Sequence, residues 1–91
     1  MSLSDQEIDR RLAGSDWSRE GDAIVRECKL ADFAAAIALV NQVAELAERA
    51  NHHPDILVHG WNRVRLTLST HSAGGLTDTD FVLASEIDRL G

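Results

Sequence analysis

The sequence predicts an α+β domain in the order α-β-β-α-β-β-α, with a four-stranded antiparallel sheet and three helices packed on one of its faces. Three observations predict this class. Residues 23–30 and 62–70 alternate apolar and polar side chains, residues 32–51 repeat apolar side chains at helical spacing, and the connections are short. Short connections favour antiparallel neighbours, and a sheet that is apolar on one face needs helices on that face only.

The chain opens with a short predicted helix over residues 4–12, in which Ser4 and Glu7 have the spacing of a capping box. A short strand over residues 17–19 and a turn lead into the strand of residues 23–30. The inner face of that strand carries one charged residue among apolar ones: Ile24, Arg26, Cys28 and Leu30.

The longest predicted helix covers residues 32–51, with Asp32 as its N-cap and Pro54 just beyond its end. Its apolar stripe is predicted to be Phe33, Ile37, Val40, Ala44 and Ala47, flanked by Ala36, Val43 and Leu46. The helix is rich in alanine, so its apolar face is smooth, allows close approach and is suited to packing on a sheet.

Two strands and a helix complete the domain. The strands are predicted at residues 56–58 and 62–70, and a loop at residues 72–75 leads into a helix over residues 77–90. Thr77 is the predicted N-cap of this helix, and Asp80 occupies the capping-box position. Its predicted buried stripe is Phe81, Ala84, Ile87 and Leu90.

Composition narrows the possible functions. The 91 residues form one domain, predicted to span residues 1–91, with 15 acidic and nine basic side chains and a net charge of −6. This charge argues against direct nucleic-acid binding, and no apolar run approaches the ~18 residues of a membrane span. A single cysteine and a polar start predict a reduced, cytoplasmic protein without an intrachain disulfide. So short a domain is marginal alone, which favours a homo-oligomer.

Three histidines stand where helices and strands end. His52 and His53 follow the longest helix, and His71 follows the clearest strand. Imidazole is the natural general acid or base near neutral pH. Simpler interpretations stay open: His52 and His53 as partners of a helix dipole, Asp80 as a cap only, and Glu48 as a solvated residue. A zinc site is the weaker alternative, because adjacent histidines seldom point at one centre and no cysteine set accompanies them.

Taken as one string, these residues resemble a known signature. Glu48, three residues, His52-His53-Pro54, six residues, Trp61, nine residues, His71, eight residues and Asp80 are similar to the pattern of the pterin-4a-carbinolamine dehydratases. Further landmarks of that family are Trp17, Ile24-x-Arg26, Asp32-Phe33, Trp61-Asn62-x-Val64, Thr70-His71 and Gly75-Leu76-Thr77. The resemblance covers roughly residues 15–90.

The resemblance implies a lyase that dehydrates 4a-hydroxytetrahydropterin, such as 4a-hydroxytetrahydrobiopterin, to quinonoid dihydropterin in tetrahydrobiopterin recycling. It implies His52 and His71 as the acid/base pair, with His53 touching the hydroxyl or ring. Asp80 and Glu48 would orient the imidazoles, and the implied reaction needs neither a metal ion nor a cofactor.

Trp17 and Trp61 are candidates for the pocket wall, and core packing is an equally open role for each. The implied partners are an aromatic amino acid hydroxylase and further copies of the chain, as a homodimer through sheet edges or a homotetramer through helix 32–51 as well. The alternative is a non-enzymatic module on the same fold that binds a transcription factor or serves in assembly.

Overall fold

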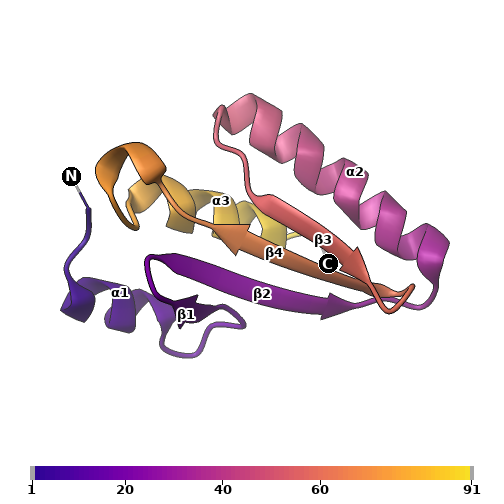
Figure 1. Ribbon diagram of the computed structural model, residues 1–91, viewed down its shortest axis with the longest axis horizontal. Helices are drawn as coiled ribbons and strands as arrows, with labels where there is room; N and C mark the ends of the chain where they lie inside the picture. Colours follow the sequence, from indigo (N-terminus) through magenta and orange to yellow (C-terminus); the bar gives the residue numbers. More distant parts are fainter. Residues whose placement is uncertain (1, 91) are drawn as a thin grey trace.

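Four antiparallel strands and three α-helices follow one another in the predicted order in the structure, a computed structural model that describes residues 2–90 (Figure 1). The first and last residues of the predicted 1–91 domain lie outside the described residues. The elements in chain order are α1 (Asp5–Leu12), β1 (Ser18–Glu20), β2 (Ala23–Lys29), α2 (Phe33–Ala50), β3 (Asp55–His59), β4 (Arg63–Leu68), the 3₁₀ turn η1 (His71–Ala73) and α3 (Asp78–Asp88).

The strands lie in the order β1-β2-β4-β3, and every neighbouring pair is antiparallel. Ile24 of β2 lies opposite Leu68 of β4, and Val58 of β3 lies opposite Val64. This register directs the even-numbered side chains of β2 and β4 to one face, where the apolar ones form a single core with side chains from all three helices. The fully or almost fully buried members of that core include Ile8, Ile24, Ala36, Val43, Val64, Leu66, Leu68, Leu83 and Ile87. The predicted fold class is therefore confirmed.

The predicted helix starts are confirmed in detail. Ser4 accepts a hydrogen bond from the backbone N–H of Glu7, and Asp32 accepts one from Ala35. At α3, Thr77 and Asp80 form the predicted capping box. Each cap uses a side chain three residues from its backbone partner, so local spacing is enough to predict it.

The predicted apolar stripe of α2 is correct at Ala47, which is buried, and at Val40, which packs against the core, but wrong at Phe33, Ile37 and Ala44, which are exposed. The buried residues are Ala36, Val43 and Ala47, whereas Phe33 is 54% exposed and Ile37 is 37% exposed. An alanine-rich helix offers more than one apolar face, and contact with β3, β4 and α3 selects which face is buried. In α3, likewise, Leu83 joins the buried set, and the helix ends at Asp88 rather than at residue 90.

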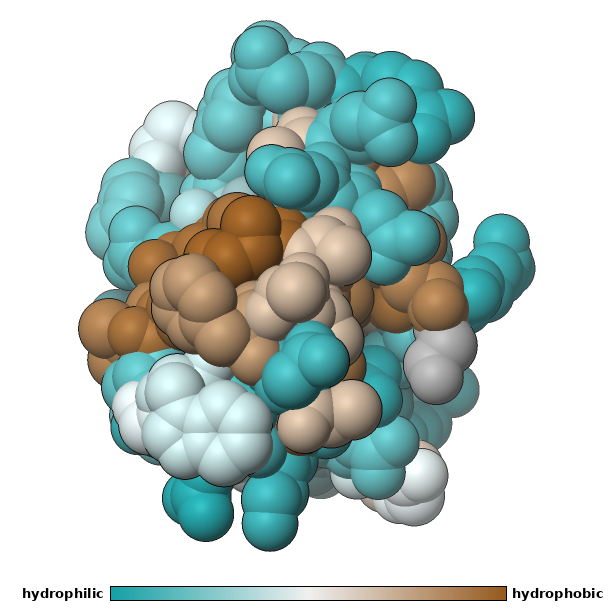
Figure 2. Space-filling view, turned by 90° about the vertical axis from the view of Figure 1, so that its right-hand side faces the viewer, coloured by the Kyte–Doolittle hydropathy of each residue, from teal (hydrophilic) through white to brown (hydrophobic). Residues whose placement is uncertain are grey.

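The displaced stripe leaves apolar side chains at one end of the molecule. Figure 2 shows apolar atoms gathered on the side that includes the start of α2, where Phe33 and Ile37 are exposed. No helix within residues 2–90 is both long and apolar enough to cross a membrane.

Candidate active site

The centre of the candidate site is a contact between His52 and Asp80, two residues that are distant in the chain. His52 Nε2 lies 2.5 Å from Asp80 Oδ1. The Asp80 carboxylate is fully buried, and the His52 side chain is 14% exposed. A buried carboxylate needs partners for its oxygens, so this contact fixes the imidazole at the boundary between the core and solvent.

The second oxygen of Asp80 is also fully used. Asp80 Oδ2 accepts a hydrogen bond from the Thr70 hydroxyl at 2.7 Å and another from the backbone N–H of Thr77 at 2.9 Å. The carboxylate therefore joins the end of β4, the start of α3 and the segment after α2. This arrangement explains how a charged group is accommodated at zero exposure.

The hydrogen-bond pattern determines which nitrogen of His52 holds a proton in the neutral ring. An ionised carboxylate can only accept hydrogen bonds, so Nε2 of His52 must carry the hydrogen that lies between it and Asp80 Oδ1. Nδ1 then has a free lone pair. The pair is thus arranged to keep one ring nitrogen as a donor to Asp80 and to leave the other as a base.

The end of α2 places the two adjacent histidines differently. Asn51 adopts a left-handed conformation with φ 49° and caps α2, and the His52 N–H donates to the Ala47 carbonyl. The chain therefore turns back at once, and His52 points toward α3. His53 instead faces Glu48 one turn earlier, with Nε2 2.5 Å from Oε2, and both side chains are exposed.

His71 is the first residue of η1, directly after Thr70, and it is exposed. Its side chain helps to line a hollow of about 350 Å³ together with Asp55, the residue that follows His53-Pro54. The other lining residues are Asp22, Ala23, Thr67, Ser69, Thr70, Gly74 and Gly75. The segment after α2 and the turn after β4 therefore meet at one end of the sheet.

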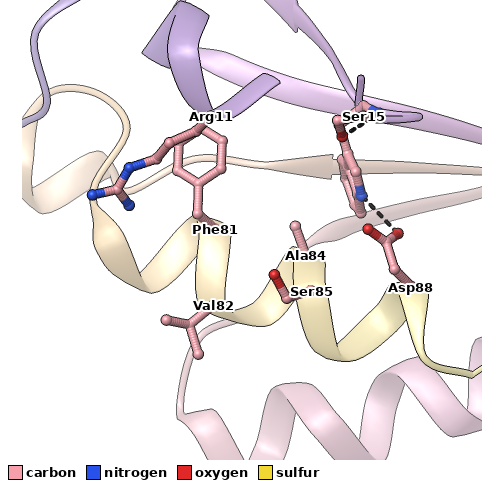
Figure 3. A pocket seen from close by; sticks show the side chains of 8 residues that line it. Arg11, Ser15, Phe81, Val82, Ala84, Ser85 and Asp88 are labelled. Atoms are coloured by element: carbon pink, nitrogen blue, oxygen red, sulfur yellow. Dashed lines mark hydrogen bonds between the residues drawn. The ribbon is translucent and has the colours of Figure 1, made fainter. Parts of the chain in front are cut away.

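The two predicted tryptophans lie elsewhere in the single chain. Trp17 is 4% exposed and donates from Nε1 to Asp88 Oδ1 at 2.9 Å. Asp88 is eight residues after Asp80, about 12 Å along α3. Figure 3 shows this region, where Arg11 lies over the Phe81 ring, with 5.4 Å between the guanidinium carbon and the ring centroid. Trp17 is thus part of the core beside a second hollow.

Trp61 is 63% exposed and has a positive φ of 57° in the turn between β3 and β4. The six residues of β4 separate this turn from the end of the sheet that carries His71, which is about 20 Å. The structure therefore brings His52 to Asp80 and links Asp80 through Thr70 to the turn of His71. Neither His52 nor His53 lines the hollow beside His71, and neither tryptophan lies there.

Thr70 is a site residue that the spaced sequence signature does not identify. It was visible only as the neighbour of His71, because spacing gives no sign that its hydroxyl reaches Asp80 ten residues later. Within residues 2–90, no group of three histidine, cysteine, aspartate or glutamate side chains is arranged to hold a metal ion.

The chain is similar in sequence to known proteins. Residues 1–90 match the family model described as pterin 4 alpha carbinolamine dehydratase. A Chloroflexus aurantiacus protein with the provisional name pterin-4-alpha-carbinolamine dehydratase is 57% identical over 89 residues, which cover 97% of this chain and 95% of that protein. A Nocardia farcinica protein with the same name is 56% identical, with 97% and 93% covered.

Two solved structures are also similar. The transcriptional coactivator/pterin dehydratase from Brucella melitensis has a TM-score of 0.92 and 32% identity, and the match covers 99% of this chain and 98% of that one. A pterin dehydratase-like protein identified as a RuBisCO assembly factor in the alpha-carboxysome has a TM-score of 0.65 at 21% identity, with 81% and 84% covered. The second likeness concerns the fold alone.

Proposed function

Because the chain belongs to the pterin-4a-carbinolamine dehydratase family, we propose that it converts 4a-hydroxytetrahydropterins to quinonoid dihydropterins and water by histidine acid/base catalysis. The observation that carries this mechanism is the His52–Asp80 pair, which lies beside the turn that bears His71. The substrate class includes 4a-hydroxytetrahydrobiopterin, which aromatic amino acid hydroxylases produce when they use the reduced pterin.

The reaction requires two proton transfers. An acid gives a proton to the 4a-hydroxyl group, and the carbon–oxygen bond breaks with its electrons leaving on water. The lone pair of a ring nitrogen forms the new carbon–nitrogen double bond, and a base removes the proton of that nitrogen. Positioned imidazoles can perform both transfers near neutral pH, so the scheme requires no metal ion or cofactor.

We assign the two transfers to His52 and His71. The Nε2 atom of His52 is engaged by Asp80, so Nδ1 is the atom through which His52 would exchange a proton with the substrate. His71 is exposed at the hollow and is the candidate for the opposite transfer. His53, held by Glu48, would contact the hydroxyl or the ring and orient it.

Trp17 and Trp61 are weaker candidates for residues of the pocket wall. Trp17 is buried and bonded to Asp88, which supports a packing role. Trp61 lies at the far end of β4, so it could line a pterin site only if another copy of the chain brought it there.

The test is stopped-flow measurement of 4a-hydroxytetrahydropterin decay with and without the protein. His52→Ala and His71→Ala should each lower the rate by about 10²–10⁴, the usual contribution of a positioned acid or base. His59→Ala is the matched control, because His59 lies at the end of β3 remote from His52 and pairs with Glu27. Full activity in the His52→Ala/His71→Ala double variant would contradict the assignment.

The alternative is a binding or assembly module on the same fold. The name of the Brucella melitensis structure includes a transcriptional coactivator, so this alternative has a specific relative behind it. A module of this kind does not need His52, His53 and His71, and this chain has all three. If the wild-type protein does not accelerate decay of the carbinolamine, the binding function takes precedence.

We further propose a homodimer that pairs the free part of β2, with a homotetramer formed through α2. Strand β1 pairs only with residues 23–25 of β2, so within residues 2–90 the outer edge of residues 26–29 has no strand partner. An unpaired edge favours pairing across a two-fold axis. The exposed Phe33 and Ile37 give α2 an apolar surface for the second contact. The single cysteine supports a reducing, cytoplasmic compartment.

Light scattering tests the assembly. A mass near that of the 10.0 kDa chain would refute association, double that mass supports the strand-edge dimer, and fourfold supports the tetramer. Ile37→Asp should convert a tetramer to a dimer, because it places a charge in the proposed helix contact. A tetramer that survives this substitution would rule out the α2 surface.

A further inference from the structure

We propose that Thr70 is a positioning residue that couples the two halves of the site, because its hydroxyl holds the carboxylate that orients His52 and its backbone closes the turn that carries His71. This inference rests on the proposed function for its catalytic consequence only. Its structural consequence can be measured on the protein without substrate.

The hydroxyl of Thr70 has a fixed direction. It donates its one hydrogen to Asp80 Oδ2 at 2.7 Å, so the 2.9 Å contact with the Thr77 hydroxyl must be donated by Thr77. The hydrogen bonds therefore run from Thr77 to Thr70 and from Thr70 to Asp80. On its other oxygen, Asp80 receives the hydrogen of His52. Loss of the Thr70 hydroxyl interrupts this chain next to the carboxylate.

The backbone of Thr70 holds the second half of the site, which is the turn that carries His71. Its carbonyl accepts from the N–H groups of Ala73 at 3.0 Å and Gly75 at 3.4 Å, and its own N–H donates to the Gly75 carbonyl at 3.3 Å. These bonds close the loop from Thr70 to Gly75, and His71 lies inside it. Gly74 has a positive φ of 72°, which lets the chain turn back within so few residues.

The residue type suits this double role. A β-branched side chain has few χ1 rotamers, so the backbone position of Thr70 also fixes the position of its hydroxyl. A displacement of the His71 turn therefore moves the group that bonds Asp80, and a displacement of Asp80 pulls on the turn. Thr70 therefore links the carboxylate that holds the His52 ring to the turn that carries His71.

The experiment compares Thr70→Val, which removes the hydroxyl and keeps the shape, with Thr70→Ser, which keeps the hydroxyl. Thr79→Val is the matched control, since Thr79 is exposed in the first turn of α3 beside Asp80. Loss of a hydrogen bond to a charged group should lower kcat by roughly ten- to a hundredfold in the valine variant. KM should change little, because Thr70 acts through Asp80 and not on the substrate. The serine variant should recover most of the rate.

A spectroscopic measurement decides the structural part. Long-range ¹H–¹⁵N spectra of the imidazole rings should show the Nε2–H form of His52 in the wild type and in the Thr70→Ser and Thr79→Val variants. In Thr70→Val, the signals of both His52 and His71 should shift. If the added methyl group prevents folding, Thr70→Ala is measured with the same expected results.

Unchanged ring signals together with a kcat within twofold of the wild type in the variant that lacks the hydroxyl would overturn the proposal. Absence of dehydration by the wild-type protein would instead contradict the proposed function. In that case the ring signals alone decide whether Thr70 couples the two histidines.

Discussion

Asp80→Asn changes only one atom of the side chain, yet we expect it to reverse the roles of the two nitrogens of His52. The backbone N–H of Thr77 can only donate, so an amide oxygen must remain where Asp80 Oδ2 now accepts that bond. The amide NH₂ is then directed at His52, in place of the oxygen 2.5 Å from Nε2. His52 has to present a lone pair there, so its hydrogen moves to Nδ1, the atom proposed to act on the substrate.

The stability cost follows from the bonds that lose their charge. The carboxylate accepts from His52, Thr70 and Thr77, and hydrogen bonds to charged groups contribute about 1.5–3 kcal/mol against about 1 kcal/mol for neutral ones. Since all three bonds can persist in neutral form, we expect a loss of about 2 kcal/mol. For a domain of this size, that lowers Tm by roughly 8–16 °C.

The assay combines thermal unfolding, stopped-flow kinetics and ring ¹⁵N spectra of the same protein. Asp80→Asn should lower the dehydration rate by about 10²–10⁴, because the base at Nδ1 is lost. Asp78→Asn is the matched control: it removes the same charge from the same turn of α3, but this side chain is 73% exposed and pairs with Arg11. The control should lose under about 1 kcal/mol and keep its rate. A fully active Asp80→Asn protein with the wild-type His52 tautomer would refute the reasoning.

Three further predictions concern the core and its edges. Leu66→Ala removes a fully buried side chain and should cost about 3–5 kcal/mol in urea unfolding, and a loss below about 1 kcal/mol would contradict its place in the core. Trp17→Phe removes the bond from the indole N–H to Asp88 and should cost about 1 kcal/mol in the same measurement, whereas an unchanged Tm would show that this bond contributes nothing. Burial raises the pKa of the Cys28 thiol, so the folded state binds the thiol proton more tightly than the unfolded state. The stability that this proton contributes is present at lower pH and is lost as the pH rises past the ordinary thiol range and through the raised pKa. Iodoacetamide at mildly alkaline pH should therefore alkylate Cys28 more slowly in the native protein than in urea, and equal rates would contradict the prediction.

How far the sequence could predict this structure depends on the range of each interaction. Ser4, Asp32 and Thr77 were predictable as caps because each bonds a backbone group three residues away. The buried face of α2 was not, because Phe33 and Ile37 are as apolar as the residues that are buried instead. Only contact with the sheet distinguishes the two faces.

The same difference between local and long-range interactions decides which parts of the site could be predicted. The three histidines were recognisable by their places at element ends and by the spaced signature. The pairing of His52 with Asp80 joins residues 28 positions apart, so it depends on how α2 and α3 lie against the sheet. No local pattern of the sequence encodes that contact. For the same reason, the sequence leaves the role of Trp61 open between the pocket wall and core packing, and the length of β4 separates this residue from His71 within the chain.

Asp80 has two roles, and natural selection acts on both through the same side chain. It completes the capping box of α3, and it holds the imidazole of His52. A descendant of this fold that abandoned the reaction would still need the carboxylate to begin its helix. Persistence of this aspartate therefore says little about whether a protein is an enzyme, and the same holds for His52, because its ring supplies a partner to the buried carboxylate. The exposed side chain of His71 can change at little structural cost once activity is lost. Inactive relatives should accordingly be sought by the loss of His71.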